Sequence, residues 1–191
     1  MHKIKNIPCI ILSGGKSSRM GEDKSLLPFG GFETLIEFQH DKLSKIFQNI
    51  YLSSKSDKFD FPCQIIYDES EVYSPMVALN SIFQTLQEEK VFIISVDTPL
   101  LEEETIQKLI EKSYDKDFDV TVCRDNDKIH NLIGVFDSTI LGKITEMLSA
   151  DNHKINTLLT QKVKLQIVFF EDKKQFSNIN TREDYLKLGD F

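Results

Sequence analysis

The feature that most constrains the fold is a repeated order of apolar runs and amphipathic stretches along the first hundred or so residues. Residues 7–13 (IPCIILS) form a continuous apolar run ended by Gly-Gly, which is typical of a strand buried on both faces. Residues 34–47 place apolar side chains at helical spacing, and Thr34 with Glu37 indicates a capping-box start. The same order recurs, so we expect strands at 7–13, 49–53, 63–67 and 91–96, with helices at 34–47, 77–86 and 102–112. Such alternation predicts parallel strands joined by right-handed crossovers.

The second half of the chain continues with further strands and helices. We expect strands at 119–123, 132–136 and 165–170, and helices at 139–148, 152–160 and 181–188, where Thr181 and Asp184 resemble a capping box. No linker, repeat or low-complexity tract interrupts the 191 residues. The sequence therefore predicts one α/β domain over residues 1–191, with three layers (α/β/α) and a mostly parallel, mixed sheet.

Composition excludes several classes of function. The net charge of −7 argues against general nucleic-acid binding, although a local basic site for a small phosphorylated ligand stays open. The apolar runs are too short to span a bilayer, so we expect no membrane association. Cys9, Cys63 and Cys123 form no CxxC pair, which predicts reduced thiols and a cytoplasmic protein.

Polar residues follow three of the predicted strands. They are the loop at residues 13–24, the pair Asp68-Glu69, and residues 97–99 (DTP). Ligands of open parallel sheets bind beyond the carboxyl ends of the strands. Three separate strand ends of this kind predict one shared site for a phosphorylated ligand.

The first loop has the chemistry of a phosphate site. Gly14 and Gly15 allow positive φ and close backbone approach, and successive N–H groups can cradle phosphate oxygens. Arg19 offers a planar fork and Lys24 a compact charge. The pattern is neither GxxxxGK[ST] nor GxGxxG. A glycine-rich turn with solvated charges is the alternative, and the basic residues after a buried strand favour phosphate binding.

Two carboxylates are candidates for binding a metal or the nucleotide. Asp97 follows a buried strand, where a carboxylate is well placed to hold Mg²⁺ beside substrate phosphates. Asp68 could bind metal, orient the nucleotide, or serve only as a turn residue. No Ser-His-Asp or Cys-His set is evident, and His130 is interpreted as a structural residue.

Three motifs together resemble one enzyme family. Residues 12–15 (LSGG), 19–21 (RMG) and 23–24 (DK) are similar to the nucleotide-binding signature of the molybdenum cofactor guanylyltransferases. Residues 96–99 (VDTP) resemble that family's metal-binding stretch, and 178–181 (NINT) its closing Asn-x-Asn-Thr segment. The likeness spans essentially the whole chain and implies a Rossmann-like nucleotidyltransferase domain.

The resemblance also implies a reaction and a set of site residues. The family transfers GMP from GTP to Mo-molybdopterin, releases pyrophosphate and uses Mg²⁺. Lys24, Arg19 and Asp97 would then be catalytic, with Asp97 on the metal. Residues implied to bind GTP or, for the last two, the molybdopterin side are Leu12, Ser13, Gly14, Gly15, Lys24, Ser54, Asp68, Asp97, Asn178 and Asn180. Transient contacts with proteins that deliver or receive the cofactor are also implied.

The chain departs from the family pattern at two places. The family's guanine-pocket Asn falls at Ser53 or Ser54, and a Gly-Pro-Leu-x-Gly stretch reads Ser-Pro-Met-Val-Ala-Leu from Ser74 to Leu79. We expect the bulk of Leu79 to crowd the pocket. Two alternatives follow: a cytidylyltransferase acting on molybdopterin or another small phosphorylated acceptor, and a catalytically weak nucleotide-binding paralogue.

Overall fold

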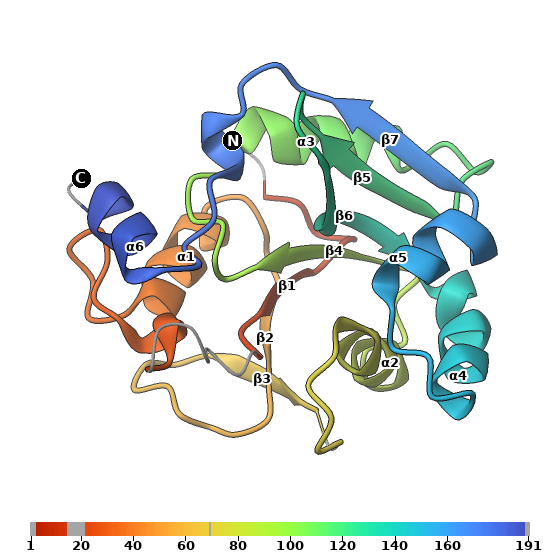
Figure 1. Cartoon of the computed structure of the whole chain (residues 1–191), viewed down its shortest axis with the longest axis horizontal. Helices are drawn as coiled ribbons and strands as arrows, with labels where there is room; N and C mark the ends of the chain where they lie inside the picture. The colour runs from red at the N-terminus through yellow and green to blue at the C-terminus, as the bar shows by residue number, and fades with distance from the viewer. Residues whose placement is uncertain (1–2, 15–21, 69, 190–191) are drawn as a thin grey trace.

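The computed structural model describes residues 3–14, 22–68 and 70–189. These residues build one seven-stranded sheet with the strand order β3-β2-β1-β4-β6-β5-β7 (Figure 1). The strands are β1 (Cys9–Leu12), β2 (Ile50–Ser54), β3 (Gln64–Tyr67), β4 (Lys90–Ser95), β5 (Val120–Arg124), β6 (Ile129–Asp137) and β7 (Leu165–Phe169). The expected positions of all seven strands are therefore confirmed to within a few residues.

The sheet is mixed because one strand runs against its neighbours. β6 is antiparallel to both β4 and β5, and all other pairs are parallel. Only four residues join β5 to β6, whereas a parallel connection needs a crossover of roughly a dozen or more. Asp125 organises this turn, since its Oδ1 accepts hydrogen bonds from the N–H groups of Asp127 and Lys128, each at 2.8 Å.

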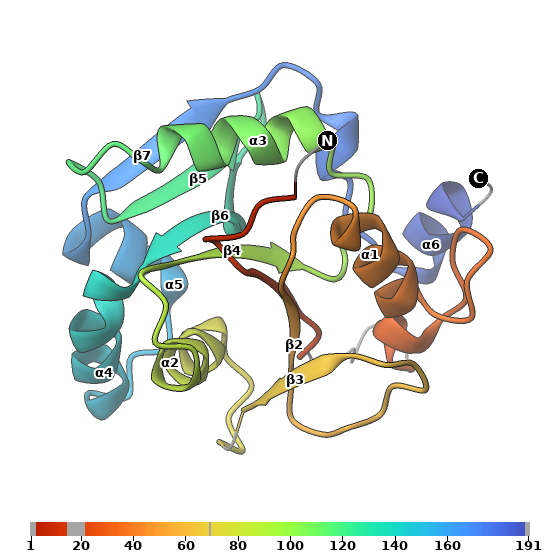
Figure 2. The ribbon, with the colours of Figure 1, turned by 180° about the vertical axis from the view of Figure 1, so that it is seen from behind.

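Helices cover both faces of the sheet, which confirms the three-layer prediction. They are α1 (Leu35–Ser44), α2 (Pro75–Thr85), α3 (Glu103–Lys112), α4 (Leu141–Ser149), α5 (Ile155–Thr157) and α6 (Arg182–Leu188). α1 and α3 pack on one face, and α2 and α4 pack on the other (Figure 2). The chain from 152 to 160 is less regular than expected, because α5 gives way to a π-helical turn at Leu158–Lys162.

Alternating side chains of the central strands feed these two layers. Cys9 and Ile11 of β1 belong to the core under α1 and α3, and Ile10 and Leu12 to the core under α2 and α4. Burial of each such aliphatic side chain contributes about 1.5–3 kcal/mol relative to exposure. This two-sided burial explains why β1 reads as a continuous apolar run.

Several helix ends match the predicted sequence signals. Thr34 caps α1 by accepting a hydrogen bond from the N–H of Glu37, and Thr181 with Asp184 forms a reciprocal capping box on α6. No helix within the described residues is long and apolar enough to cross a membrane.

Candidate active site

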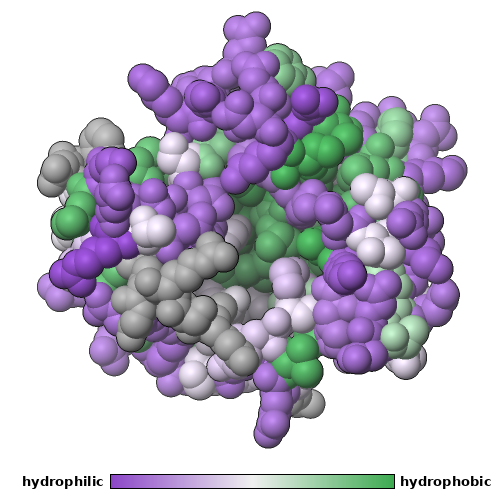
Figure 3. All heavy atoms as spheres, in the orientation of Figure 1, coloured by the Kyte–Doolittle hydropathy of each residue, from purple (hydrophilic) through white to green (hydrophobic). Residues whose placement is uncertain are grey.

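The carboxyl ends of four parallel strands meet at one edge of the sheet. Leu12 at the end of β1 is in register with Ser53 of β2 and Ser95 of β4, and Ser54 of β2 with Tyr67 of β3. Main-chain hydrogen bonds continue beyond the strands, with the N–H of Asp68 donating to Ser54 at 3.0 Å. The three predicted polar strand ends therefore lie at a common edge. This face of the molecule is hollowed near its centre, where hydrophobic residues are exposed (Figure 3).

Lys24 and Asp97 form an ion pair at this edge. Lys24 Nζ lies 2.7 Å from Asp97 Oδ2 and also donates to the main-chain carbonyl of Ile179 at 3.2 Å. Both side chains are largely shielded, at 18% and 14% exposed. The N–H of Ile179 in turn donates to the carbonyl of Asp97 at 2.9 Å. Lys24, Asp97 and Ile179, from three distant parts of the chain, thus contact one another at this edge.

A short capped turn positions Lys24. Asp23 caps the 3₁₀ helix Lys24–Leu26 by accepting a hydrogen bond from the N–H of Ser25 at 3.0 Å. Burial raises the pKa of Asp23, but hydrogen bonds from Lys58 and Ser25 outweigh it and leave that pKa below its ordinary value. Asp23 therefore serves the local structure of the loop, while the neighbouring Lys24 points to Asp97.

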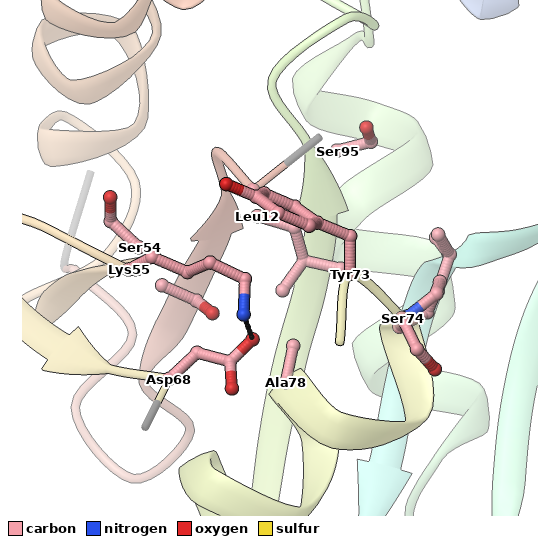
Figure 4. Close-up of a pocket in the computed structure, with 12 residues that line it drawn as sticks. Leu12, Ser54, Lys55, Asp68, Tyr73, Ser74, Ala78 and Ser95 are labelled. Carbon is pink, nitrogen blue, oxygen red and sulfur yellow. Dashed lines mark ion pairs between the residues drawn. The ribbon is translucent and has the colours of Figure 1, made fainter. Parts of the chain in front are cut away.

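A first cavity opens beside β1, β2 and β3. Among its lining residues are Leu12, Gly14, Ser53, Ser54, Lys55, Asp68, Tyr73, Ser74, Pro75 and Ala78 (Figure 4). Ser13 is buried instead, and its Oγ donates to the carbonyl of Ser53 at 2.9 Å. A Cβ built at Gly14 would meet no described atom within 4 Å. Among the described glycines only Gly30 and Gly31 have positive φ, so Gly14 gives room for close approach rather than an unusual turn.

A second, wider cavity of about 250 Å³ lies beside the first. Its lining includes Asp97, Thr98, Lys128, His130 and Asn178, and Ser95 and Leu132 line both cavities. Thr98 Oγ1 contacts Asp97 Oδ1 at 3.3 Å and Asn178 Oδ1 at 3.5 Å. The carboxylate of Asp97 therefore belongs to the second cavity and adjoins the wall shared with the first.

Some of the predicted site residues lie elsewhere. Asn180 is exposed and lines neither cavity, and its N–H donates to Asp184 Oδ2 at 3.2 Å, at the start of α6. Gly15 and Arg19 lie outside the described residues. The structure thus places Leu12, Gly14, Ser54 and Asp68 in the lining of the first cavity and Asp97 and Asn178 in the lining of the second. Lys24 lines neither cavity and is joined to the second through its ion pair with Asp97.

The expectation that Leu79 crowds the pocket is wrong. Leu79 is fully buried on the inward face of α2, among Met76, Ile82 and Phe83. One residue earlier, Ala78 lines the first cavity. A helix turns by about 100° per residue, so adjacent positions face different surroundings. The small methyl group of Ala78, and not the Leu79 side chain, therefore stands at the cavity wall.

His130 is structural, as the sequence predicted, although it borders the second cavity. Its Nε2 lies 3.2 Å from Asp125 Oδ2, and its ring stacks on Phe176 with centroids 4.4 Å apart. Burial lowers the pKa of His130, while Asp125 opposes that shift. The histidine therefore fixes the β5–β6 turn at the rim of the cavity.

Sequence reasoning missed Lys55 and assigned no ligand role to Tyr73. Both line the first cavity, and Lys55 Nζ lies 4.5 Å from the centroid of the Tyr73 ring. The signal available was a basic residue two positions after the second predicted strand.

Metal-ligand clusters give little further guidance. In the parts of the chain that the structure describes, no three His, Cys, Asp or Glu side chains gather closely enough to hold a metal by themselves. A metal at Asp97 would need additional ligands from substrate and water.

Comparison with known proteins gives consistent matches over the whole chain. The family model described as MobA-like NTP transferase domain matches residues 9–165. Molybdenum cofactor guanylyltransferase from Campylobacter jejuni strain RM1221 is 39% identical, over 97% of each chain. The protein of that name from Helicobacter pylori strain 26695 is 33% identical, over 95% of this chain and 91% of its own.

A solved structure shows the same fold. It is molybdopterin-guanine dinucleotide biosynthesis protein A from Archaeoglobus fulgidus, with a TM-score of 0.82, 16% identity, and coverage of 96% of this chain and 97% of that one.

Proposed function

This chain is a member of the molybdenum cofactor guanylyltransferase family, and from that membership we propose that it transfers GMP from GTP to Mo-molybdopterin with release of pyrophosphate. The single observation that carries the proposal is the Lys24–Asp97 pair, which joins a cation to a carboxylate in the lining of the second cavity, two residues beyond Ser95, which lines both cavities. A reaction between two bound substrates needs two adjoining sites with charged groups at their junction.

The first cavity is the proposed nucleotide site. Leu12 and Gly14 line it at the end of β1, and the open space at Gly14 leaves room for a phosphate against the backbone. Ser54 at the end of β2 and Asp68 just after β3 also line it, and we propose that the base lies beside them. Lys24, and Arg19 from the loop outside the described residues, would neutralise charge on the triphosphate.

Asp97 is the proposed metal-binding residue. One carboxylate fits Mg²⁺, because this ion commonly takes one or two carboxylates and completes its shell with substrate phosphates and water. Bound there, Mg²⁺ would supply charge stabilisation for the departing pyrophosphate. Asp97 is held in place from both sides, by Lys24 at Oδ2 and Thr98 at Oδ1. Lys24 would turn from the carboxylate to the phosphates when GTP binds.

The second cavity is the proposed molybdopterin site. Asn178, which the buried Thr98 contacts at 3.5 Å, offers an amide there, and Lys128 offers a positive charge for a phosphorylated acceptor. The terminal phosphate of the acceptor would attack the α-phosphorus of GTP as pyrophosphate leaves. A phosphate is already ionised at neutral pH, so the protein needs to align and stabilise rather than to remove a proton.

Two further statements accompany this proposal. Cys9, Cys63 and Cys123 are free thiols, which supports a reducing, cytoplasmic location. Proteins that deliver molybdopterin or receive the product would contact the chain only transiently.

The test is thermal unfolding with GTP, CTP, ATP or UTP, each with Mg²⁺, followed by pyrophosphate release in the presence of molybdopterin. A ligand at one hundred times its Kd stabilises a protein by about 2.7 kcal/mol. Of the four nucleotides, we expect only GTP to give this stabilisation and to support turnover. Turnover with CTP and not GTP would replace the proposal by the cytidylyltransferase alternative. Binding of GTP without turnover would indicate the catalytically weak paralogue.

A further inference from the structure

Lys55 and Asp68 form a charge pair in the wall of the first cavity. They follow β2 and β3, which are adjacent parallel strands, so the sheet brings them to the same edge. Lys55 Nζ lies 3.5 Å from Asp68 Oδ2, and the side chains are 19% and 8% exposed. Figure 4 shows the two groups pointing toward one another, with the Tyr73 side chain nearby.

The ammonium of Lys55 is tethered to the chain that follows β3. It donates to the carbonyls of Ser70 and Val72, the latter at 3.2 Å. Its separation from Asp68 exceeds the ~2.7–2.9 Å of a short charged hydrogen bond. Two of the three ammonium donors go to these carbonyls, which leaves one. An ionised carboxylate has about four acceptor sites, of which Oδ1 of Asp68 uses one for the N–H of Ser70 at 3.2 Å. The pair can therefore still bond to a ligand edge placed against it.

The order of polar groups matches one base. The wall presents a donor (Lys55) followed by the two oxygens of a carboxylate (Asp68). Guanine presents the complementary order along its Watson–Crick edge: the O6 acceptor, then the N1–H and N2–H₂ donors. We propose that Lys55 is a specificity-determining residue that donates to guanine O6 while Asp68 accepts from N1–H and N2–H₂. This inference rests on the proposed function, because it assumes that the first cavity holds the base of a nucleoside triphosphate.

The other bases mismatch this wall. In the same orientation, adenine places an amino group against the ammonium and the N1 acceptor against the carboxylate. Cytosine places its amino group against the ammonium and two acceptors, N3 and O2, against the carboxylate. Uracil turns a second acceptor, O2, toward Asp68. A site built to hydrogen-bond its substrate rejects analogues strongly, because the mismatched buried groups are left unpaired. Tyr73, 48% exposed at the cavity, places its ring 4.5 Å from Lys55 Nζ, where the ring face stabilises the ammonium.

The test pairs a change in Lys55 with a change in the base. Dissociation constants would be measured by calorimetry for GTP and 6-thio-GTP, whose sulfur is a weak acceptor at position 6. Lys55→Met should weaken GTP binding by about tenfold or more and 6-thio-GTP binding by less than about threefold. Lys55→Arg keeps a donor and should retain most of the preference for GTP. The base contact persists throughout the reaction, so KM should rise in Lys55→Met with kcat little changed.

Controls separate this inference from the proposed function. Lys45→Met removes an exposed lysine paired with Asp41 on α1, far from the cavity, and should change neither ligand's affinity. Equal losses for GTP and 6-thio-GTP in Lys55→Met would overturn the role in reading O6. If Lys55→Met does not fold, loss of the GTP preference in the folded Lys55→Arg protein would also overturn it. Failure of the unaltered protein to bind any triphosphate would refute the proposed function itself, and this inference with it.

Discussion

The Lys24–Asp97 pair makes a quantitative prediction about the protein without ligand. Lys24→Met and Asp97→Asn, alone and together, form a double-mutant cycle whose coupling energy isolates this contact. The atoms are 2.7 Å apart and both side chains are more than four-fifths shielded, so we expect coupling of about 1–3 kcal/mol, above the ~0–1 kcal/mol of exposed pairs. For a chain of this size, each kcal/mol corresponds to roughly 2–4 °C in Tm.

The assay is urea unfolding of the four proteins, followed by circular dichroism at one pH and salt concentration. A cycle is needed because Lys24 also donates to the Ile179 carbonyl, so a single substitution removes more than the pair. Asp97→Asn should lower the free energy of unfolding more in the unaltered protein than in the Lys24→Met protein. In the unaltered protein the substitution leaves the Lys24 ammonium beside a neutral amide, whereas in Lys24→Met no ammonium is present. Coupling indistinguishable from zero would refute the geometry on which the site is built.

Two further outcomes follow from individual residues. Gly14→Ala should change the free energy of unfolding by less than about 0.5 kcal/mol, because the added methyl group meets no described atom. The same substitution should weaken GTP binding measured by calorimetry. Unchanged GTP affinity would remove Gly14 from the site. Burial lowers the pKa of His130, so the unfolded chain is protonated first as pH falls below about 6.5, and the folded state loses stability toward pH 5. His130→Gln should reduce that loss, measured as the difference in the free energy of unfolding between pH 7 and pH 5 by urea unfolding. The same difference in the variant and the unaltered protein would contradict a lowered pKa for His130.

The strands and helices were largely predictable because their signals are local. The apolar run of β1 and the capping residues Thr34 and Thr181 depend only on near neighbours in the chain, and the structure places each as expected. The reversed direction of β6 was not predicted, because the short turn at Asp125 decides it and not the strand's own composition.

The sequence predicted a site residue only where its own charge and its position after a strand were enough to indicate a role. Lys24 and Asp97 are charged residues in segments that follow predicted strands, and the structure brings them into contact. Lys55 escaped notice because its partner Asp68 is set by the sheet order, which places β3 beside β2. The prediction for Leu79 was wrong because adjacent residues of α2 face different surroundings: Ala78 lines the cavity, whereas Leu79 is buried in the core.

Under the proposed function, each of the two cavities binds one of the two substrates. The first takes the nucleotide and reads its base through Lys55 and Asp68, and the second takes the acceptor beside Asn178. Ser95 and Leu132 line both, so the reacting phosphates would meet near the end of β4. Asp97 lies two residues beyond the end of that strand, which would place the proposed metal ligand near the point of transfer.

The most direct test of the account is transfer of label from α-labelled GTP to molybdopterin by the unaltered protein, Lys24→Ala and Asp97→Ala, with folding of each checked by circular dichroism. We predict transfer by the unaltered protein and a loss of at least about 100-fold in both folded variants, the scale on which removal of a charge-stabilising group acts. Full GTP-dependent transfer by Lys24→Ala would contradict the account.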